Sequence, residues 1–126
     1  MFHSMNVIGQ SIPIYFTITE NDSTTVQVFE IINSEKEIKE IRFNVSNDIV
    51  IPINQKEYLI MFKPNNYYLI EFTGMNSKFT KNAYVKTSEA IKGFPLAATI
   101  DFKDSKALTV RYNNIKKMYE YLFYQQ

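Results

Sequence analysis

The chain has 126 residues, of which 45% are hydrophobic and 15% aromatic, and it contains no cysteine. Such a composition excludes a disordered chain and a disulfide framework, and the length fits one domain that buries its own core. The formal net charge of +1 does not favour nucleic acid as a partner. No segment has the roughly 20 apolar residues of a membrane helix, and the N-terminus lacks the pattern of a secretory signal, so we expect no membrane partner.

Alternating apolar and polar residues predict short β-strands along most of the chain, with turn-forming residues between them. Such a series of strands is typical of a β-sandwich or a barrel. The expected strands are residues 11–19, 24–32, 38–45, 49–53, 57–62, 67–73, 78–87, 96–102 and 107–112. The alternation predicts that each strand has one buried face, and the expected inward-facing sets include Ile41, Phe43 and Val45, then Ile49, Ile51 and Ile53, then Tyr68, Ile70 and Phe72.

The last 14 residues follow a different period. Ile115, Met118, Tyr119, Leu122 and Phe123 recur at helical spacing, which predicts a short amphipathic C-terminal helix, although the tyrosines favour a strand. We therefore expect an N-terminal arm over residues 1–10, a β domain over 11–112 and a helix or tail over 113–126.

The residues that usually carry catalysis are sparse. His3 is the only histidine, which argues against a His-based triad or a His-rich zinc site. Asp101 and Asp104 are close in sequence but lack the surrounding ligands of a calcium loop. We expect no enzymatic activity, no metal and no cofactor.

One predicted strand combines lysines with aromatic residues. Lys78, Lys81 and Lys86 alternate with Phe79 and Tyr84. Lysines on an edge strand discourage aggregation between sheets, and we prefer this interpretation to a surface for single-stranded nucleic acid.

The stretch "NYYLIEFTG" at residues 66–74 places Tyr67 and Leu69 opposite a core-facing set. This second face is more apolar than a hydrated face requires, so we expect the C-terminal helix or another subunit to cover it. Aromatic and methionine side chains at the chain ends are further candidates for partner contacts. The predicted partner-contact residues are Phe2, Met5, Tyr67, Leu69, Met118, Tyr121 and Tyr124.

Residues 26–87 resemble the transthyretin-like, or carboxypeptidase-regulatory-like, β-sandwich modules that are common in Bacteroidetes proteins. The matching positions are Tyr68, Ile70, Glu71 and Phe72 on the "YxIEF" motif, Thr80 and Lys81 on "TK", and Val85 and Thr87 on the closing motif. The resemblance implies a mostly β, antiparallel Ig-like or transthyretin-like sandwich of about seven to nine strands. It implies no catalytic residue.

Modules of this kind usually occur in exported proteins, whereas this N-terminus has no signal pattern. We therefore expect a structural protein of the virion of a phage that infects Bacteroidetes, such as an auxiliary capsid-decorating or tail accessory protein. Its partners would be other structural proteins or further copies of itself. The alternative is a surface-associated module that binds a glycan or a protein ligand through Tyr15, Tyr67 and Tyr84.

Overall fold

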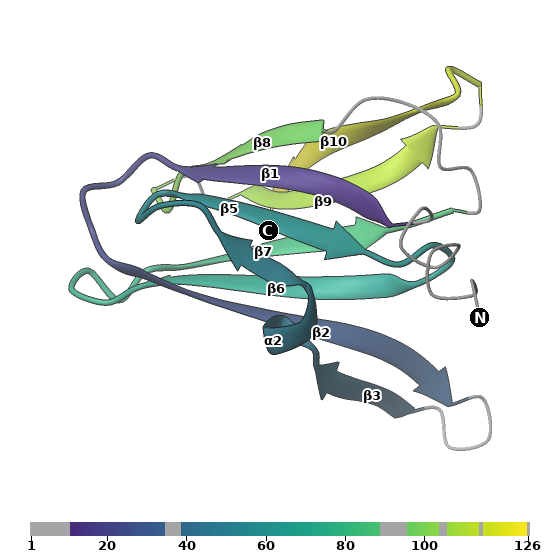
Figure 1. Ribbon diagram of the computed structural model, residues 1–126, viewed down its shortest axis with the longest axis horizontal. Coiled ribbons are helices and arrows are strands. Elements are labelled where there is room, and N and C mark those ends of the chain that lie inside the picture. Colours follow the sequence, from purple (N-terminus) through teal and green to yellow (C-terminus); the bar gives the residue numbers. More distant parts are fainter. Residues whose placement is uncertain (1–10, 35–38, 89–95, 104–105, 114, 126) are drawn as a thin grey trace, which may run out of the picture.

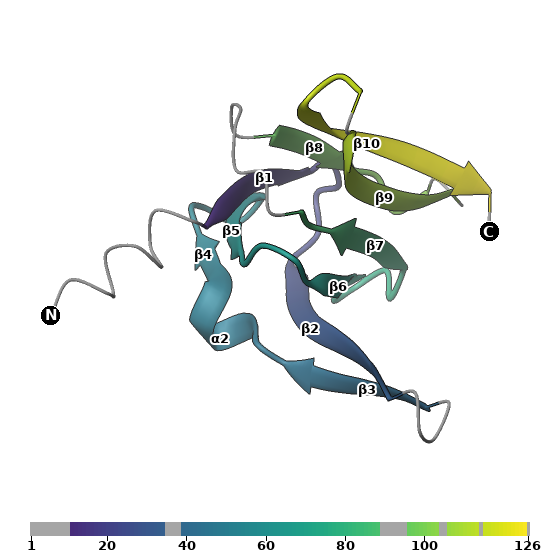
Figure 2. The same ribbon diagram turned by 90° about the vertical axis from the view of Figure 1, so that its right-hand side faces the viewer.

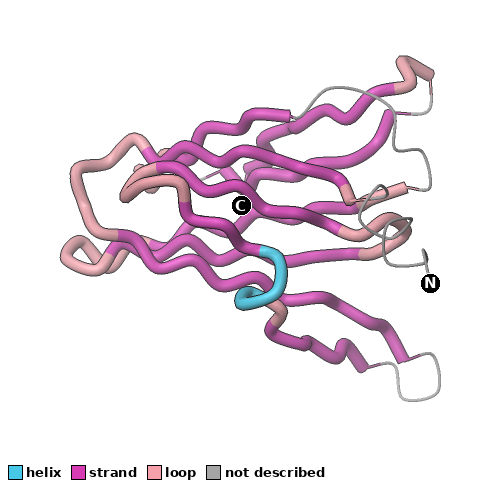
Figure 3. Tube along the Cα trace, viewed as in Figure 1, coloured by secondary structure: helices cyan, strands magenta, loops and turns pink. Residues whose placement is uncertain are grey.

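The computed structural model describes residues 11–34, 39–88, 96–103, 106–113 and 115–125. This part of the chain forms ten strands and one short helix (Figures 1 and 3). The elements are β1 (Ile12–Ile18), β2 (Thr24–Ser34), β3 (Lys39–Asn44), α2 (Ser46–Ile49), β4 (Val50–Pro52), β5 (Glu57–Phe62), β6 (Tyr67–Gly74), β7 (Thr80–Lys86), β8 (Leu96–Ile100), β9 (Lys106–Asn113) and β10 (Met118–Gln125).

The strands form two mixed sheets. The smaller sheet has the order β4-β5-β1-β8, and the larger has the order β10-β9-β7-β6-β2-β3. Most neighbours are antiparallel, but β1 pairs with β8, and β7 with β9, in parallel. The expectation of a mostly β fold is confirmed, whereas the expectation of purely antiparallel sheets is wrong for these two pairs.

Apolar residues from both sheets form one core. The ring of Phe16 on β1 lies 5.4 Å from that of Phe72 on β6, and the ring of Phe62 on β5 lies 4.9 Å from that of Tyr68 on β6. These pairs join the two layers, and aromatic contacts at such distances add to the free energy gained by burial. The predicted inward set of Tyr68, Ile70 and Phe72 is confirmed, because all three are at most 1% exposed.

The chain between the sheets departs from the predicted alternation. Residues 46–49 form α2, a single helical turn that connects β3 to β4 (Figure 3). Because this turn interrupts the two-residue period, Ile49 is buried while Ile51 and Ile53 are each 49% exposed. The predicted common inner face for these three isoleucines is therefore wrong.

The adjoining strand β3 is the edge of the larger sheet (Figure 2). All six of its residues are exposed, including Ile41 at 38% and Phe43 at 50%. The predicted burial of these two side chains is wrong as well, because β3 extends past the core.

The C-terminal segment is a strand and not a helix. Asn113 Oδ1 accepts the N–H groups of Ile115 and Lys116, and the N–H of Lys117 donates to the Asn113 carbonyl at 2.8 Å. Lys117 has a φ of 58°, so the chain reverses there and returns antiparallel to β9. Aromatic residues at every second position favour this strand, and the larger sheet continues to Gln125, beyond the predicted domain limit at residue 112.

The loops at one end of the sheets are fastened by a carboxylate. Asp22 in the β1–β2 turn accepts the N–H of Ser77 at 3.0 Å, the Ser77 hydroxyl at 2.8 Å and the N–H of Asn76 at 3.1 Å. These bonds, first those from Ser77, hold the pKa of Asp22 below its usual value. A Cβ atom at position 74 would lie 2.7 Å from Asp22 Oδ2, so a residue larger than Gly74 would disturb these hydrogen bonds.

The opposite end is fastened by a threonine. Thr87 exchanges two hydrogen bonds with Asn66: the Asn66 N–H donates to Thr87 Oγ1 at 2.8 Å and the Thr87 N–H donates to the Asn66 carbonyl at 3.0 Å. Its hydroxyl also donates to the Lys63 carbonyl at 2.7 Å. The end of β7 is thereby held against the β5–β6 turn.

Candidate functional site

The predicted partner-contact residues do not form one surface in the described part of the chain. Phe2 and Met5 lie outside the residues that the structure describes, as do the side chains of Tyr121 and Tyr124. Met118 begins β10 and is 49% exposed.

Tyr67 and Leu69 lie on the outer face of the larger sheet, but they differ in exposure. Leu69 is only 2% exposed, although no helix in the described part of the chain covers it. It stands in register between Phe29 on β2 and Tyr84 on β7, so large side chains flank it on the same face. Leu69 therefore offers almost no surface to a partner, whereas Tyr67 is 41% exposed.

The structure brings together two of the three tyrosines proposed for ligand binding. The rings of Tyr67 and Tyr84 lie side by side with centroids 6.4 Å apart and a 51° angle between their planes. Partial burial raises the pKa of Tyr67, and the neighbouring Tyr84 and Glu40 raise it further by smaller amounts. The hydroxyl of Tyr67 is therefore protonated at neutral pH. Tyr15 lies on the other sheet and contributes to a different surface.

Two cations lie in the same row of the sheet as Tyr67, and no local pattern in the sequence indicates that they meet. Tyr67 on β6 is in register with Lys86 on β7, which is in register with Arg111 on β9. The next residue in the row is Glu120 on β10, whose Oε1 lies 4.0 Å from Arg111 Nε. Within the described residues, no carboxylate forms an ion pair with Lys86.

The environment of β7 also corrects the interpretation of its lysines. This strand lies between β6 and β9, inside the larger sheet, so its lysines do not protect an edge. Lys81 is on the inner face and only 2% exposed. Lys86 is on the outer face and exposed.

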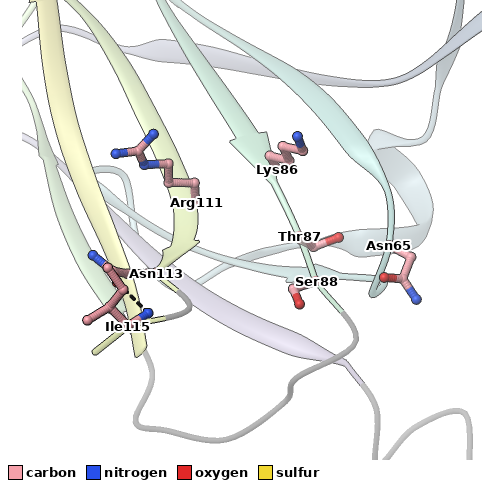
Figure 4. A pocket seen from close by; sticks show the side chains of 7 residues that line it. All are labelled: Asn65, Lys86, Thr87, Ser88, Arg111, Asn113 and Ile115. Carbon is pink, nitrogen blue, oxygen red and sulfur yellow. Dashed lines mark hydrogen bonds between the residues drawn. The ribbon is translucent and has the colours of Figure 1, made fainter. Parts of the chain in front are cut away.

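Two shallow grooves flank Lys86 at the end of the larger sheet where β6 begins and β7 ends. The first measures about 710 Å³ and lies between the ends of β7 and β9 (Figure 4). Its lining residues are Asn65, Lys86, Thr87, Ser88, Arg111, Asn113 and Ile115. In Figure 4, Arg111 and Lys86 extend from neighbouring strands, and the guanidinium of Arg111 points away from Lys86.

The second groove measures about 570 Å³ and lies beside β2 and β6. It shares Asn65, Lys86 and Thr87 with the first groove and also includes Tyr67 and Glu30. Asn65 follows a proline and has a φ of 60°, the pattern of a type II turn, which fixes this corner of both grooves.

A second surface occupies the outer face of the smaller sheet. One row across its four strands consists of Ile51, Leu59, Tyr15 and Ala97, all in register. Ile51 is 49% and Tyr15 37% exposed. We call this row, together with Met61 and Pro13 on the same face, the apolar face.

The polar border of the apolar face is formed by the next row, Glu57, Thr17 and Thr99. Isolated apolar side chains are ordinary on protein surfaces, but a contiguous set marks an interaction site more often. No ionisable group other than the Tyr15 hydroxyl interrupts the central row.

The described residues contain no group of three or more His, Cys, Asp or Glu side chains placed to hold a metal ion. His3 and Asp104 lie outside those residues. No helix in the described part of the chain has the length and apolar character needed to span a membrane. No protein-family model matches the sequence, and no curated protein matches it either.

Proposed function

We propose that the protein is a non-enzymatic structural or assembly protein that acts through protein–protein contacts. Its two sheets fit a β-sandwich, and the resemblance of residues 26–87 supports an Ig-like or transthyretin-like variety. The observation that carries the proposal is the apolar face of the smaller sheet.

A sheet that faces water on one side usually alternates apolar inward with polar outward residues. Here both sides of the smaller sheet are apolar: Ile14 and Ile60 are fully buried, and their neighbours Tyr15 and Leu59 lie on the apolar face. Adjacent strands lie about 4.8 Å apart, so the four-residue row extends over about 14 Å. Covering it removes apolar surface from water at a gain of about 25 cal/mol per Å².

The partner that fits this face best is a second copy of the same chain. An uncharged surface meets its own copy without repulsion between like charges, and two sheets pack face to face at about 10 Å. A twofold axis, the commonest symmetry of soluble oligomers, would place the apolar faces of the two copies against each other. The polar row of Glu57, Thr17 and Thr99 then forms part of the hydrated rim.

We place this assembly in a virion, as an auxiliary capsid-decorating or tail accessory component. This setting is suggested by the resemblance of residues 26–87 to a Bacteroidetes-type module, and the apolar face would supply its contact surface. Proteomic analysis of purified phage particles tests it directly. Absence of the protein from particles whose genome encodes it would refute the virion setting.

The contact surface is tested by light scattering coupled to size-exclusion chromatography across micromolar concentrations. Wild type should form dimers. Ile51→Lys would bury a charge in the contact and should raise the dissociation constant of the dimer at least about tenfold, which corresponds to about 1.4 kcal/mol or more. Thr99→Lys adds the same charge on the same sheet outside the apolar row and should leave the dimer intact. A monomeric wild type, or equal effects of both variants, would refute this contact.

A further inference from the structure

We propose that the outer face of the larger sheet binds an acidic carbohydrate, a chain of sugars that carry carboxylates, across Tyr67, Lys86 and Arg111. This surface lies on the other sheet from the apolar face and does not depend on the assembly proposal. The proposal names the class of ligand for the alternative function, that of a surface-associated binding module.

The first observation is a pair of like charges held in register. Lys86 and Arg111 are direct neighbours on the parallel strands β7 and β9. Like charges directly opposite each other on a sheet destabilise it. Glu120 lies 4.0 Å from Arg111 and offsets only one of the two cations. A carboxylate bound between them removes the repulsion, and the planar guanidinium of Arg111 can donate two hydrogen bonds to it.

The second observation is the aromatic surface beside the cations. Tyr67 is the register neighbour of Lys86, and its exposed ring adjoins that of Tyr84. A tyrosine ring offers a flat apolar face to the C–H groups of a sugar, and its hydroxyl remains a hydrogen-bond donor. From Tyr67 to Arg111 the row covers two strand spacings, about 10 Å, so one ligand of a few sugars can contact all three residues.

The charge density favours a carbohydrate over a nucleic acid. A nucleic acid strand carries one phosphate about every 3.4 Å and needs many cations along its path. The described lining of the two grooves supplies two cations, Lys86 and Arg111, and a carboxylate, Glu30. Glu120 lies beside the first groove. A polymer with widely spaced carboxylates matches this mixture, and the amide of Asn65 adds a partner for sugar hydroxyls.

Calorimetric titration with short oligosaccharides of polygalacturonate, alginate and hyaluronan tests the proposal, with methyl-esterified oligogalacturonate as the uncharged counterpart and oligothymidylate as the nucleic acid. At least one uronate should bind. Lys86→Gln and Arg111→Gln should each weaken that binding about tenfold, which corresponds to about 1.4 kcal/mol. Tyr67→Ala should weaken it similarly, and Tyr15→Ala, on the other sheet, should not.

Circular dichroism must show each variant folded, and Ile51→Lys should bind the uronate as wild type does, which separates this site from the assembly surface. The proposal is overturned if no uronate binds, if the esterified form binds equally well, or if oligothymidylate binds more tightly than every uronate.

Discussion

Replacing Tyr68 by Phe removes one buried oxygen while leaving the ring in place. The Tyr68 hydroxyl oxygen accepts the Lys63 N–H at 3.0 Å and the Asn66 side-chain amide at 3.2 Å. The residue is 1% exposed, and its ring packs against Phe62. Because the ring contacts persist in Tyr68→Phe, the change in stability reports mainly on these hydrogen bonds.

The expected loss of stability depends on whether each of the two donors keeps another acceptor. The Asn66 amide keeps a second acceptor, Glu30 Oε1, at 3.0 Å, so only the Lys63 N–H loses its partner. An unsatisfied buried donor costs about 1–3 kcal/mol, and because this one is only partly buried we expect about 1–2 kcal/mol. For 126 residues the entropy of unfolding converts this into a fall in Tm of about 4–8 °C.

Thermal and urea unfolding followed by circular dichroism measure the effect, with Tyr15→Phe as the matched control on an exposed tyrosine. Hydrogen exchange adds a local readout, since the Lys63 amide should lose protection in Tyr68→Phe. Equal stability of the two variants, with the Lys63 amide still protected, would refute the assigned role of the hydroxyl.

Three further changes test other parts of the fold. Phe16→Ala empties a fully buried site between the sheets and should lower the free energy of unfolding by about 3–5 kcal/mol in urea titrations; a loss below about 1 kcal/mol would contradict the packing described. Lys117→Gly relieves a positive φ in the β9–β10 turn, which should stabilise the folded state by about 1 kcal/mol. The greater flexibility of glycine in the unfolded chain offsets part of this gain, so Tm should rise by about 2–4 °C. A lower Tm would contradict the conformation described for this turn. Asp22 has a lowered pKa, so its ionised form stabilises the fold above its unfolded pKa of about 3.9, and this effect is lost as the pH falls through the lower pKa of the folded state. The Tm advantage of wild type over Asp22→Asn should therefore be full at pH 7 and decrease as the pH falls below about 3.9, and a constant difference would refute the linkage.

The sequence predicted strands well because alternation is a local property. Tyr68, Ile70 and Phe72 are buried as expected, since each strand needs only one apolar face. The same logic failed at Ile51 and Ile53, where one helical turn shifts the phase of the alternation. The C-terminal strand was missed because its apolar residues also fit a helical period, and the turn at Asn113 decides between the two.

The candidate sites were harder to predict than the strands. Lys86 and Arg111 are far apart in sequence, and nothing local indicates that β7 and β9 are neighbours. The apolar face was hidden for a related reason, because Tyr15, Leu59 and Ile51 come from three strands whose order only the structure supplies. Tyr67 was identified from the sequence because an exposed aromatic beside a core triplet is a local signal.

The two parallel pairs set the order in which this chain can fold. β1 lies inside the smaller sheet and requires β8 as one neighbour, so Ile14 cannot complete its pairing until Leu96 has been made. β7 likewise waits for β9, with Val85 against Val110. Pairing between distant segments slows folding. During synthesis, β1 and β7 therefore each keep one open side until the last quarter of the chain emerges, and we expect ribosome-bound fragments that end before residue 96 to aggregate or to bind chaperones.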